Sequence, residues 1–361
     1  MAILEQVDIR TAPSNLNRES VLQEIVDISL IPLPFQSRIG TMSHTNAFFE
    51  WSADRLADPD ITNVVIDGDD AGAADNDPAV RLGNHAQISE KRPGVSTRAD
   101  TSNNIGNEGL ARQIKKKTQE LQRDMEAMLL LNNANVADTG VGGAAGETAG
   151  LEAWLDDETV NSVTKDTNCI ITSASAGTIA GAGWTNRTGQ IIPAMTYTTV
   201  TAAAASFADL KAMLNALWGL GADPTVIMSR PKVIEALSAF MFTSSAQIAA
   251  PVKDVGMKAA PTQAMGAVNS MVTDHGLVVD FVPNRLMQLS DAGNSDSSTL
   301  FAFDPAYLGV SYQGGGIKSK EMPEAGRRRS VMLTADYGLC VKNPDMLGAM
   351  LGIDETAAWT A

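Results

Sequence analysis

Residues 67–107 read DGDDAGAADNDPAVRLGNHAQISEKRPGVSTRADTSNNIGN and lead directly into residues 108–133, which read EGLARQIKKKTQELQRDMEAMLLLNN. The first segment is rich in Gly, Asp and Asn and poor in large apolar side chains. Such a segment buries too little apolar surface to fold alone, and a compact domain rarely contains one so long. We therefore expect residues 67–107 to be extended and to make most of their contacts with other chains.

Residues 108–133 carry the repeat of an amphipathic helix. Apolar side chains recur every three or four positions, and basic side chains lie largely opposite them. At 1.5 Å per residue this helix would be about 40 Å long. The apolar stripe consists of Leu110, Ile114, Leu121, Met125, Met128 and Leu129, and the other face holds Lys115, Lys116, Lys117 and Arg123.

A second unit begins after a region of mixed short strands and turns that ends near residue 205. Ser206 is a suitable N-cap for a helix that Gly219 and Gly221 would close. The stretch TVIMS predicts a buried strand, and Pro231 opens a further helix. Because strands and helices follow no regular alternation, the fold class is α+β rather than repeated βαβ units. Later strands are expected in HGLVVDFVPN, STLFAFDPAYLGVSYQ and SVMLTADYGLCVK, the last with Val331, Leu333 and Leu339 facing a core.

Composition limits the class of protein. The 361 residues are 44% hydrophobic, which suffices for one large domain or a few smaller ones. Aromatic residues make up only 5%, which favours closely packed layers over a ring-lined ligand pocket. The formal net charge is -15, and this argues against a general nucleic-acid binder because phosphate binding needs clustered Lys and Arg. A position near nucleic acid without binding it is compatible with this charge.

The cysteines and the hydropathy pattern point to a soluble protein made inside a cell. Cys169 and Cys340 form neither a CxxC motif nor a metal-binding set, so we expect two reduced thiols. The N-terminal residues MAILEQVDIR lack a basic region followed by an apolar stretch, so no signal peptide is expected. No run of apolar residues is long enough to span a membrane.

The sequence shows no set of residues with the spacing of a known catalytic or cofactor site. The three histidines are His44, His85 and His275, and no G-x-S-x-G motif accompanies them. Asp274 and His275 are adjacent, but we interpret them as a turn pair at the head of a strand. The G-x-G-x-x-A match of residues 140–145 follows a helix rather than a strand, so it lacks the context of a dinucleotide site. We expect no catalytic residue and no cofactor.

Paired carboxylates are the remaining candidates for a metal site. Asp69–Asp70 and residues 156–158 (Asp-Asp-Glu) lie in Gly-rich or turn-like stretches, so we interpret them as solvated loop charge. A weak calcium site is the alternative, although no twelve-residue EF-hand pattern fits. The sequence therefore predicts no dedicated metal site.

Five short motifs occur in one order along the first part of the chain. A Gly-Leu-x-x-Trp-Leu stretch follows them at residues 150–155. Together they resemble the major capsid (head) proteins of tailed bacteriophages, which share the Hong-Kong-97-type shell fold. The five are Leu33-Pro34-Phe35, Glu50-Trp51-Ser52-Ala53-Asp54-Arg55-Leu56, Asn84-His85-Ala86-Gln87-Ile88, Gly94-Val95-Ser96-Thr97 and Glu120-Leu121-Gln122-Arg123-Asp124-Met125-Glu126.

The resemblance covers about residues 18–155 and implies a division of the whole chain. It also implies that the extended loop lies across a neighbouring subunit. The expected parts are an N-terminal arm (1–46), an extended loop (47–107), a peripheral domain (108–205) with a spine helix (108–133), an axial domain (206–320) and a return to the peripheral domain with the C-terminal tail (321–361).

The resemblance implies a structural subunit that assembles with itself into hexamers and pentamers. Other expected partners are a portal protein, a decoration or cement protein, and packaged dsDNA lying nearby without sequence-specific binding. Few residues precede the Trp51 segment, so we expect a separate scaffolding protein. The expected location is the virion capsid, assembled in the host cytoplasm, with no membrane partner.

The candidates for subunit contacts are charged and aromatic side chains of the loop and of the two basic runs, Lys115–Lys117 and Arg327–Arg329. Lys91 could also form an isopeptide bond with an Asn, but the sequence identifies no carboxylate to promote it. The candidates are Trp51, Asp54, Arg81, Lys91, Arg92, Lys115, Lys116, Lys117, Arg327, Arg328 and Arg329.

Two other functions stay open at this point. An encapsulin-like nanocompartment shell uses the same fold to enclose an enzyme, and residues 1–20 do not separate it from a phage capsid. A soluble hydrolase or ligand-binding protein would instead be a discrete monomer with one defined pocket. Microscopy of the expressed protein distinguishes a shell protein from a soluble monomer, since only a shell protein forms closed particles or ring-shaped hexamers and pentamers.

Overall fold

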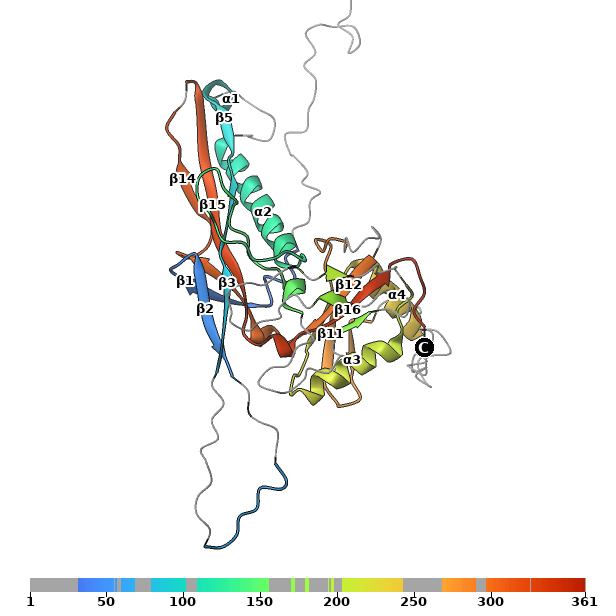
Figure 1. Cartoon of the computed structure of the whole chain (residues 1–361). Coiled ribbons are helices and arrows are strands. Elements are labelled where there is room, and N and C mark those ends of the chain that lie inside the picture. Colours follow the sequence, from blue (N-terminus) through green and yellow to red (C-terminus); the bar gives the residue numbers. More distant parts are fainter. Residues whose placement is uncertain are drawn as a thin grey trace, which may run out of the picture.

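The computed structural model describes most of the chain after the N-terminal arm. Residues 1–31 of that arm, Asp69–Asp70, Cys169 and residues 156–158 lie outside the described residues. The described part forms an elongated half built on a long sheet and a more rounded lobe beside it (Figure 1). The described residues are 32–54, 56, 60–68, 79–101, 109–155, 170–172, 179–181, 194, 196–197, 203–242, 268–289, 297–324 and 326–360.

The strand β15 organises the sheet of the elongated half. It pairs antiparallel with β13, β14, β4 and β5, and β1 extends the sheet as the parallel partner of β13. Val331, Leu333 and Leu339 of β15 are buried, as the sequence predicted. The strands are β1 (Gly40–His44), β4 (Gln87–Lys91), β5 (Gly94–Ser96), β13 (Leu308–Gln313), β14 (Lys318–Glu321) and β15 (Arg328–Val341).

The long helix α2 (Leu110–Leu129) packs on this sheet, chiefly against β15 and β4. Its apolar stripe is confirmed, because Leu121, Met125 and Leu129 are buried while Lys115 and Lys116 are exposed. The helix places one buried carboxylate, that of Glu126, on the same inward face.

The helix ends at Leu129 rather than at Asn133, so the expected length of about 40 Å is wrong and about 30 Å is correct for 20 residues. Asn133 explains this end. Its side-chain amide donates to the Thr148 carbonyl, and its own carbonyl accepts the N–H of Gly150 at 3.2 Å. These bonds hold the chain in a turn instead of a further helical turn.

The rounded lobe is a six-stranded sheet packed against α3 (Phe207–Gly219) and α4 (Pro231–Phe242). Ser206 caps α3 through an N–H···O bond from Ala208 at 3.2 Å, and Gly221 follows the helix with φ +85°, as predicted. The sheet runs in the order β10 (Ser270–Val272), β11 (Val278–Pro283), β9 (Val226–Ser229), β12 (Ser297–Phe303), β16 (Gly348–Asp354) and β6 (Ile170–Thr172).

The chain crosses between the two halves more often than the sequence suggested. We expected residues 206–320 to stay in one domain and the return to begin at residue 321. Instead β13 already belongs to the sheet of the elongated half, while β16 and β6 belong to the sheet of the lobe. Pairing between strands far apart in sequence causes these crossings, and local composition does not encode it.

The projecting loop is shorter than expected. It lies between β2 (Phe48–Ala53) and β3 (Val80–His85), which pair antiparallel, and Figure 1 shows residues 60–68 far from the rest of the subunit. The expectation that all of residues 67–107 projects is wrong for residues 80–96, because Leu82 and Asn84 are buried and β4 and β5 pair with β15. The strand β1 likewise places the end of the expected N-terminal arm within the sheet.

Short elements complete the described part. The helix α1 (Thr97–Thr101) follows β5, and β7 (Ile179–Gly181) pairs with β8 (Thr196–Tyr197). Three 3-10 turns are η1 (Leu151–Trp154), η3 (Pro305–Tyr307) and η4 (Pro344–Met346).

Candidate subunit-contact surfaces

Several residues of the motifs that carry the resemblance make defined contacts inside the subunit. The Glu126 carboxylate accepts N–H bonds from Phe35 at 2.7 Å and Gln36 at 3.0 Å, and from the Asn284 amide at 2.9 Å. Burial raises the pKa of Glu126, while these hydrogen bonds act in the opposite direction. One side chain of α2 therefore joins the start of the described chain to the residue that follows β11.

Asn84 plays a similar role at the base of the projecting loop. Its fully buried side chain donates to the Leu339 carbonyl at 2.8 Å and accepts the Ala149 N–H at 3.0 Å. Its amide also donates to the Thr148 hydroxyl at 3.0 Å, and the side-chain amide oxygen of Gln87 accepts the Thr148 N–H at 3.4 Å. The Asn-x-x-Gln motif thus joins β3 and β4 to β15 and residues 148–149.

Trp51, a candidate contact residue, makes defined contacts inside its own subunit. The indole N–H donates to the Val341 carbonyl at 2.9 Å, and the ring lies 5.5 Å from that of Trp154. Asp54 follows at the end of β2 and is exposed. Trp51 therefore anchors the base of the loop within its own subunit. A role of Trp51 in contacts between subunits stays a prediction.

The Gly150-to-Leu155 motif forms the buried turn η1. A Cβ at Gly150 would lie 1.9 Å from the Leu131 carbonyl oxygen, so only glycine fits there. Glu152 is 5% exposed, and burial raises its pKa to about 8 although a contact with Thr299 lowers it. A neutral carboxyl group therefore lies in the core at neutral pH.

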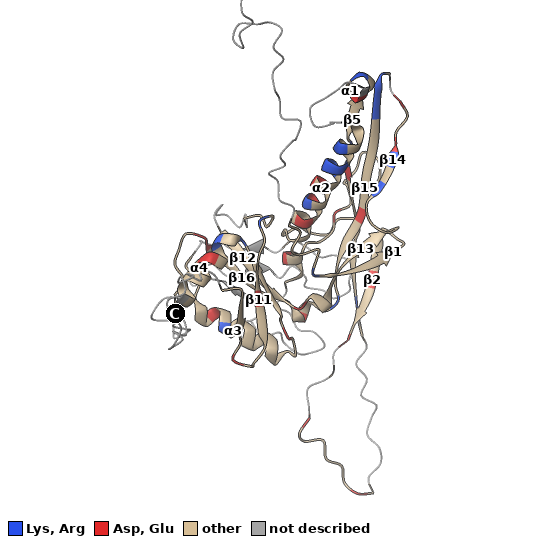
Figure 2. Cartoon of the chain, turned by 180° about the vertical axis from the view of Figure 1, so that it is seen from behind, with Lys and Arg blue, Asp and Glu red and all other residues tan. Residues whose placement is uncertain are grey.

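Basic side chains gather at the end of the elongated half. We call the group formed by Arg98, Lys115, Lys116 and Arg327–Arg329 the basic end, and Figure 2 shows it around α1, the start of β15 and the first half of α2. Arg329 lies 3.7 Å from Asp100, 3.8 Å from Glu321 and 3.7 Å from Glu324.

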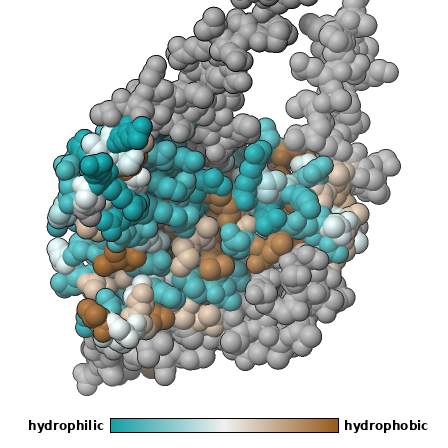
Figure 3. Space-filling view, turned by 90° about the horizontal axis from the view of Figure 1, so that it is seen from above, coloured by the Kyte–Doolittle hydropathy of each residue, from teal (hydrophilic) through white to brown (hydrophobic). Residues whose placement is uncertain are grey.

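The rest of the basic end faces solvent. Arg327 and Arg328 are exposed and pair with no carboxylate within the described part of the chain. Seen from above, the described surface is mostly hydrophilic, with apolar side chains in separated patches (Figure 3). Arg327 and Arg328 thus present positive charge at the surface of a subunit whose net charge is -15.

The remaining charged candidates have partners within the subunit. Lys91 of β4 pairs with Asp124 of α2 at 2.6 Å, and this hydrogen bond raises the pKa of Lys91. Arg81 pairs with Glu50 across β2 and β3. Two further contacts are those of Lys117 with Glu120 at 2.5 Å and of Arg92 with the Ser330 hydroxyl at 3.3 Å.

An apolar segment at the end of the loop was not among the candidates. Ile61, Val64, Val65 and Ile66 are 94%, 85%, 77% and 77% exposed. The run ITNVVI stands immediately before the polar stretch at residue 67 and, from composition alone, is typical of a buried strand. Its exposure in a projecting loop is a signal of binding that only the structure reveals.

The residues considered for catalysis lie in turns. Asp274 and His275 occupy the turn between β10 and β11, where Asp274 pairs with Lys211 at 3.2 Å and His275 stacks on Trp218 at 4.3 Å. Gly140 and Gly142 lie in an exposed turn after α2, with positive φ. Among the described residues, no three His, Cys, Asp or Glu side chains group as metal ligands, and no helix could cross a membrane.

Solved structures show which fold these elements form. A chain of the native GTA particle capsid matches with TM-score 0.59 and 11% identity, covering 95% of this chain and 97% of that one. The Cyanophage A-1(L) capsid matches with TM-score 0.58 and 14% identity, covering 94% and 98%. The SrpI encapsulin of Synechococcus elongatus PCC 7942 matches with TM-score 0.50 and 12% identity, covering 96% and 95%. The expected α+β class and Hong-Kong-97-type shell fold are confirmed.

Sequence comparison identifies the family. The model of the family described as SU10 major capsid protein matches residues 8–354. The major capsid protein of Escherichia phage Phieco32 is 36% identical over 102 residues, which cover 28% of this chain and 29% of the length of that relative. The chain belongs to the SU10 major capsid protein family.

Proposed function

We propose that this chain is the major capsid protein of a tailed phage, and that its copies assemble into hexamers and pentamers that close an icosahedral shell around dsDNA. The observation that carries the proposal is the family match of the chain, together with a loop that projects from the subunit and has an exposed apolar end. Water-exposed aliphatic side chains on such a loop gain stability only when another surface covers them. The role is structural rather than catalytic.

The proposed parts of the subunit follow the resemblance. The elongated half with α2 corresponds to the peripheral domain, the rounded lobe to the axial domain, and residues 54–79 to the extended loop. Contacts between subunits would include the basic end, where Arg327 and Arg328 meet carboxylates of neighbouring copies. Further partners would be a separate scaffolding protein, a portal protein and a decoration protein, with assembly in the host cytoplasm.

The packaged DNA would lie inside the shell without specific binding. A net charge of -15 repels phosphate, which would leave packed DNA mobile. An encapsulin-like compartment has the same fold, but the family match over residues 8–354 favours the phage capsid.

Negative-stain microscopy of the purified full chain tests the proposal. Closed shells, or rings of five and six subunits, are the expected result, alone or after addition of a scaffolding protein from the same phage. Uniform particles of single-subunit size under both conditions would contradict it.

A further inference from the structure

Asp67 and Gly68 form the one Asp-Gly pair of the sequence, which contains no Asn-Gly pair. The pair stands immediately after the exposed apolar run ITNVVI of the projecting loop. An aspartate carboxyl group that precedes glycine can close a five-membered ring with the next backbone nitrogen, because no Cβ shields that nitrogen. The surroundings of the two residues decide whether this ring closure takes place.

The surroundings of Asp67 and Gly68 leave both residues free to react. Both are exposed, and Figure 1 shows residues 60–68 far from the rest of the subunit. A Cβ placed on Gly68 would meet no atom within 4 Å, and its φ of +87° favours glycine. Among the described residues, neither the Gly68 N–H nor the Asp67 carboxylate has a hydrogen-bond partner. The nitrogen and the carboxyl group can therefore approach each other without losing a contact to the described part of the chain.

Asp60 lies on the same loop and serves as an internal comparison. Its carboxylate accepts hydrogen bonds from the Thr62 hydroxyl at 2.6 Å and the Thr62 N–H at 2.8 Å, and these bonds lower its pKa. The next residue is Ile61, whose branched side chain crowds the backbone nitrogen. An ionised, hydrogen-bonded carboxylate before a branched residue closes the ring slowly, so Asp60 should stay unchanged where Asp67 reacts.

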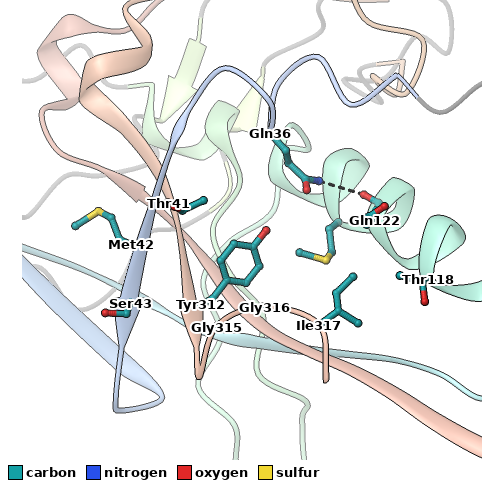
Figure 4. Close-up of a pocket in the computed structure, with 11 residues that line it drawn as sticks. Gln36, Thr41, Met42, Ser43, Thr118, Gln122, Tyr312, Gly315, Gly316 and Ile317 are labelled. Carbon is teal, nitrogen blue, oxygen red and sulfur yellow. Dashed lines mark hydrogen bonds between the residues drawn. The ribbon is translucent and has the colours of Figure 1, made fainter. Parts of the chain in front are cut away.

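The groove beside α2 lacks the side chains for this reaction. It lies between α2, the strand β1 and the turn that joins β13 to β14, and its volume is about 440 Å³ (Figure 4). Its lining contains no Asp, Asn, His or Cys, and the Gln36 amide donates to the Gln122 carbonyl at 3.1 Å. The groove therefore has no residue that could form a five-membered ring with its backbone.

We propose that Asp67 is a modification site, at which the unassembled subunit converts spontaneously to isoaspartate and is then excluded from shells. The Gly68 nitrogen attacks Cγ of the protonated Asp67 carboxyl group, a C–N bond forms, and one water molecule leaves. Water then adds to the succinimide ring. Cleavage of the bond between this nitrogen and the main-chain carbonyl carbon gives isoaspartate, whereas cleavage of the bond to Cγ restores aspartate. The two steps consume no net water and need neither an enzyme nor an oxidant.

The product changes the loop directly after its apolar run. Isoaspartate adds one carbon to the main chain and carries its carboxylate on Cα, so residues 61–66 shift relative to Gly68. The effect on assembly rests on the proposed function, in which another surface covers the exposed aliphatic side chains of this run. Converted subunits should therefore enter shells less often than unmodified ones.

Incubation of the purified full chain in H₂¹⁸O tests the modification without any shell. Hydrolysis of the succinimide places one ¹⁸O atom in the product, and mass spectrometry with electron-transfer fragmentation distinguishes isoaspartate from aspartate. The label should accumulate at residue 67 and not at Asp60. Asp67→Glu should prevent it, because glutamate would have to close a six-membered ring. No label at residue 67, or equal label at Asp60, would overturn the inference and leave the proposed function intact.

Assembly after storage tests the effect of the product. Parent, Asp67→Glu and Asp60→Glu chains are stored unassembled for the same time, and both substitutions keep the charge of the exposed loop. The parent and Asp60→Glu should lose shell yield in proportion to the converted fraction, whereas Asp67→Glu should keep its yield. Equal isoaspartate in shells and in the remaining free subunits would overturn the exclusion from shells. If fresh parent chain forms no shells, the proposed function fails, while the ¹⁸O experiment still decides the modification.

Discussion

Glu152 carries a carboxyl group into the core between the elongated half and the lobe. Its pKa of about 8 lies above the value of about 4.3 for an unfolded chain, so the unfolded state loses its proton first. The free energy of unfolding therefore falls as pH rises from about 4.5 to about 8, by up to about 1.4 kcal/mol per pH unit. Below that window Glu152 is protonated in both states, so the free energy of unfolding is highest there and no longer changes with pH through this group.

Replacing Glu152 by Gln tests this directly. The amide keeps the shape but cannot ionise, so the variant should gain stability over the parent as pH rises from about 5 to about 8. Urea denaturation of both proteins at several pH values measures the difference. A difference that stays constant with pH would show that Glu152 is not the titrating group.

Glu126 provides a second test at the residue scale. Glu126→Ala removes three acceptor contacts and leaves the N–H of Phe35 and the Asn284 amide without them. Each buried donor left unsatisfied costs about 1–3 kcal/mol, so we expect a loss of several kcal/mol in unfolding free energy. Glu126→Gln retains an acceptor and should lose less. Equal losses in the two variants would contradict the hydrogen-bonding explanation.

At the scale of elements, the turn η1 depends on a missing side chain. Gly150→Ala would force a Cβ against the Leu131 carbonyl, so we expect a destabilisation of about 3 kcal/mol, the upper end of the usual cost of overpacking a core. Gly219→Ala is the matched control, because nothing lies within 4 Å of a Cβ there and Ala favours the helix by up to about 1 kcal/mol. The melting temperatures of both variants and of the parent measure the difference in stability. A Gly150→Ala melting temperature near that of the parent would contradict the close approach.

Sequence periodicity predicted the elements that bury a regular stripe. The faces of α2 and α3, and the strands β9, β11 and β15, were all visible from spacing and caps. The residues QISEK of β4 alternate between half-buried and exposed positions, which is compatible with a strand, but their spacing does not show that this strand joins the sheet of β15. Its partner β15 lies more than two hundred residues away, so only long-range pairing identifies it.

The candidate site was predicted only in part for a similar reason. Charge patterns suggested Lys91 and Arg81 as subunit contacts. In the structure Lys91 pairs with Asp124 and Arg81 with Glu50, both within the subunit. The exposed apolar residues Ile61, Val64, Val65 and Ile66 were not predicted as contact residues, because the run resembles a core strand. Whether an aliphatic run is buried depends on the whole fold, which spacing alone does not reveal.

At the scale of the whole molecule, charge should control assembly. Replacing Arg327, Arg328 and Arg329 by Ser should leave the subunit folded, because exposed ion pairs contribute at most about 1 kcal/mol each. Shell formation should slow at least about tenfold and lose part of its salt dependence, since several weak contacts act together at every interface. Light scattering at increasing NaCl concentrations measures both effects.

A second triple variant controls for the change in net charge. Lys211, Lys232 and Arg285 lie in the rounded lobe, and their replacement by Ser removes the same formal charge away from the basic end. If both triple variants assemble at the same rate and with the same salt dependence, net charge rather than the basic end controls assembly.

The central claim is that copies of this fold close a shell, and cryo-electron microscopy of particles assembled from the full chain tests it most directly. A reconstruction should show an icosahedral shell of hexamers and pentamers, with α2 and β15 of each subunit recognisable and the loop after β2 reaching a neighbour. A full chain that stays monomeric with its scaffolding protein, or that forms only open aggregates without icosahedral symmetry, would contradict the account.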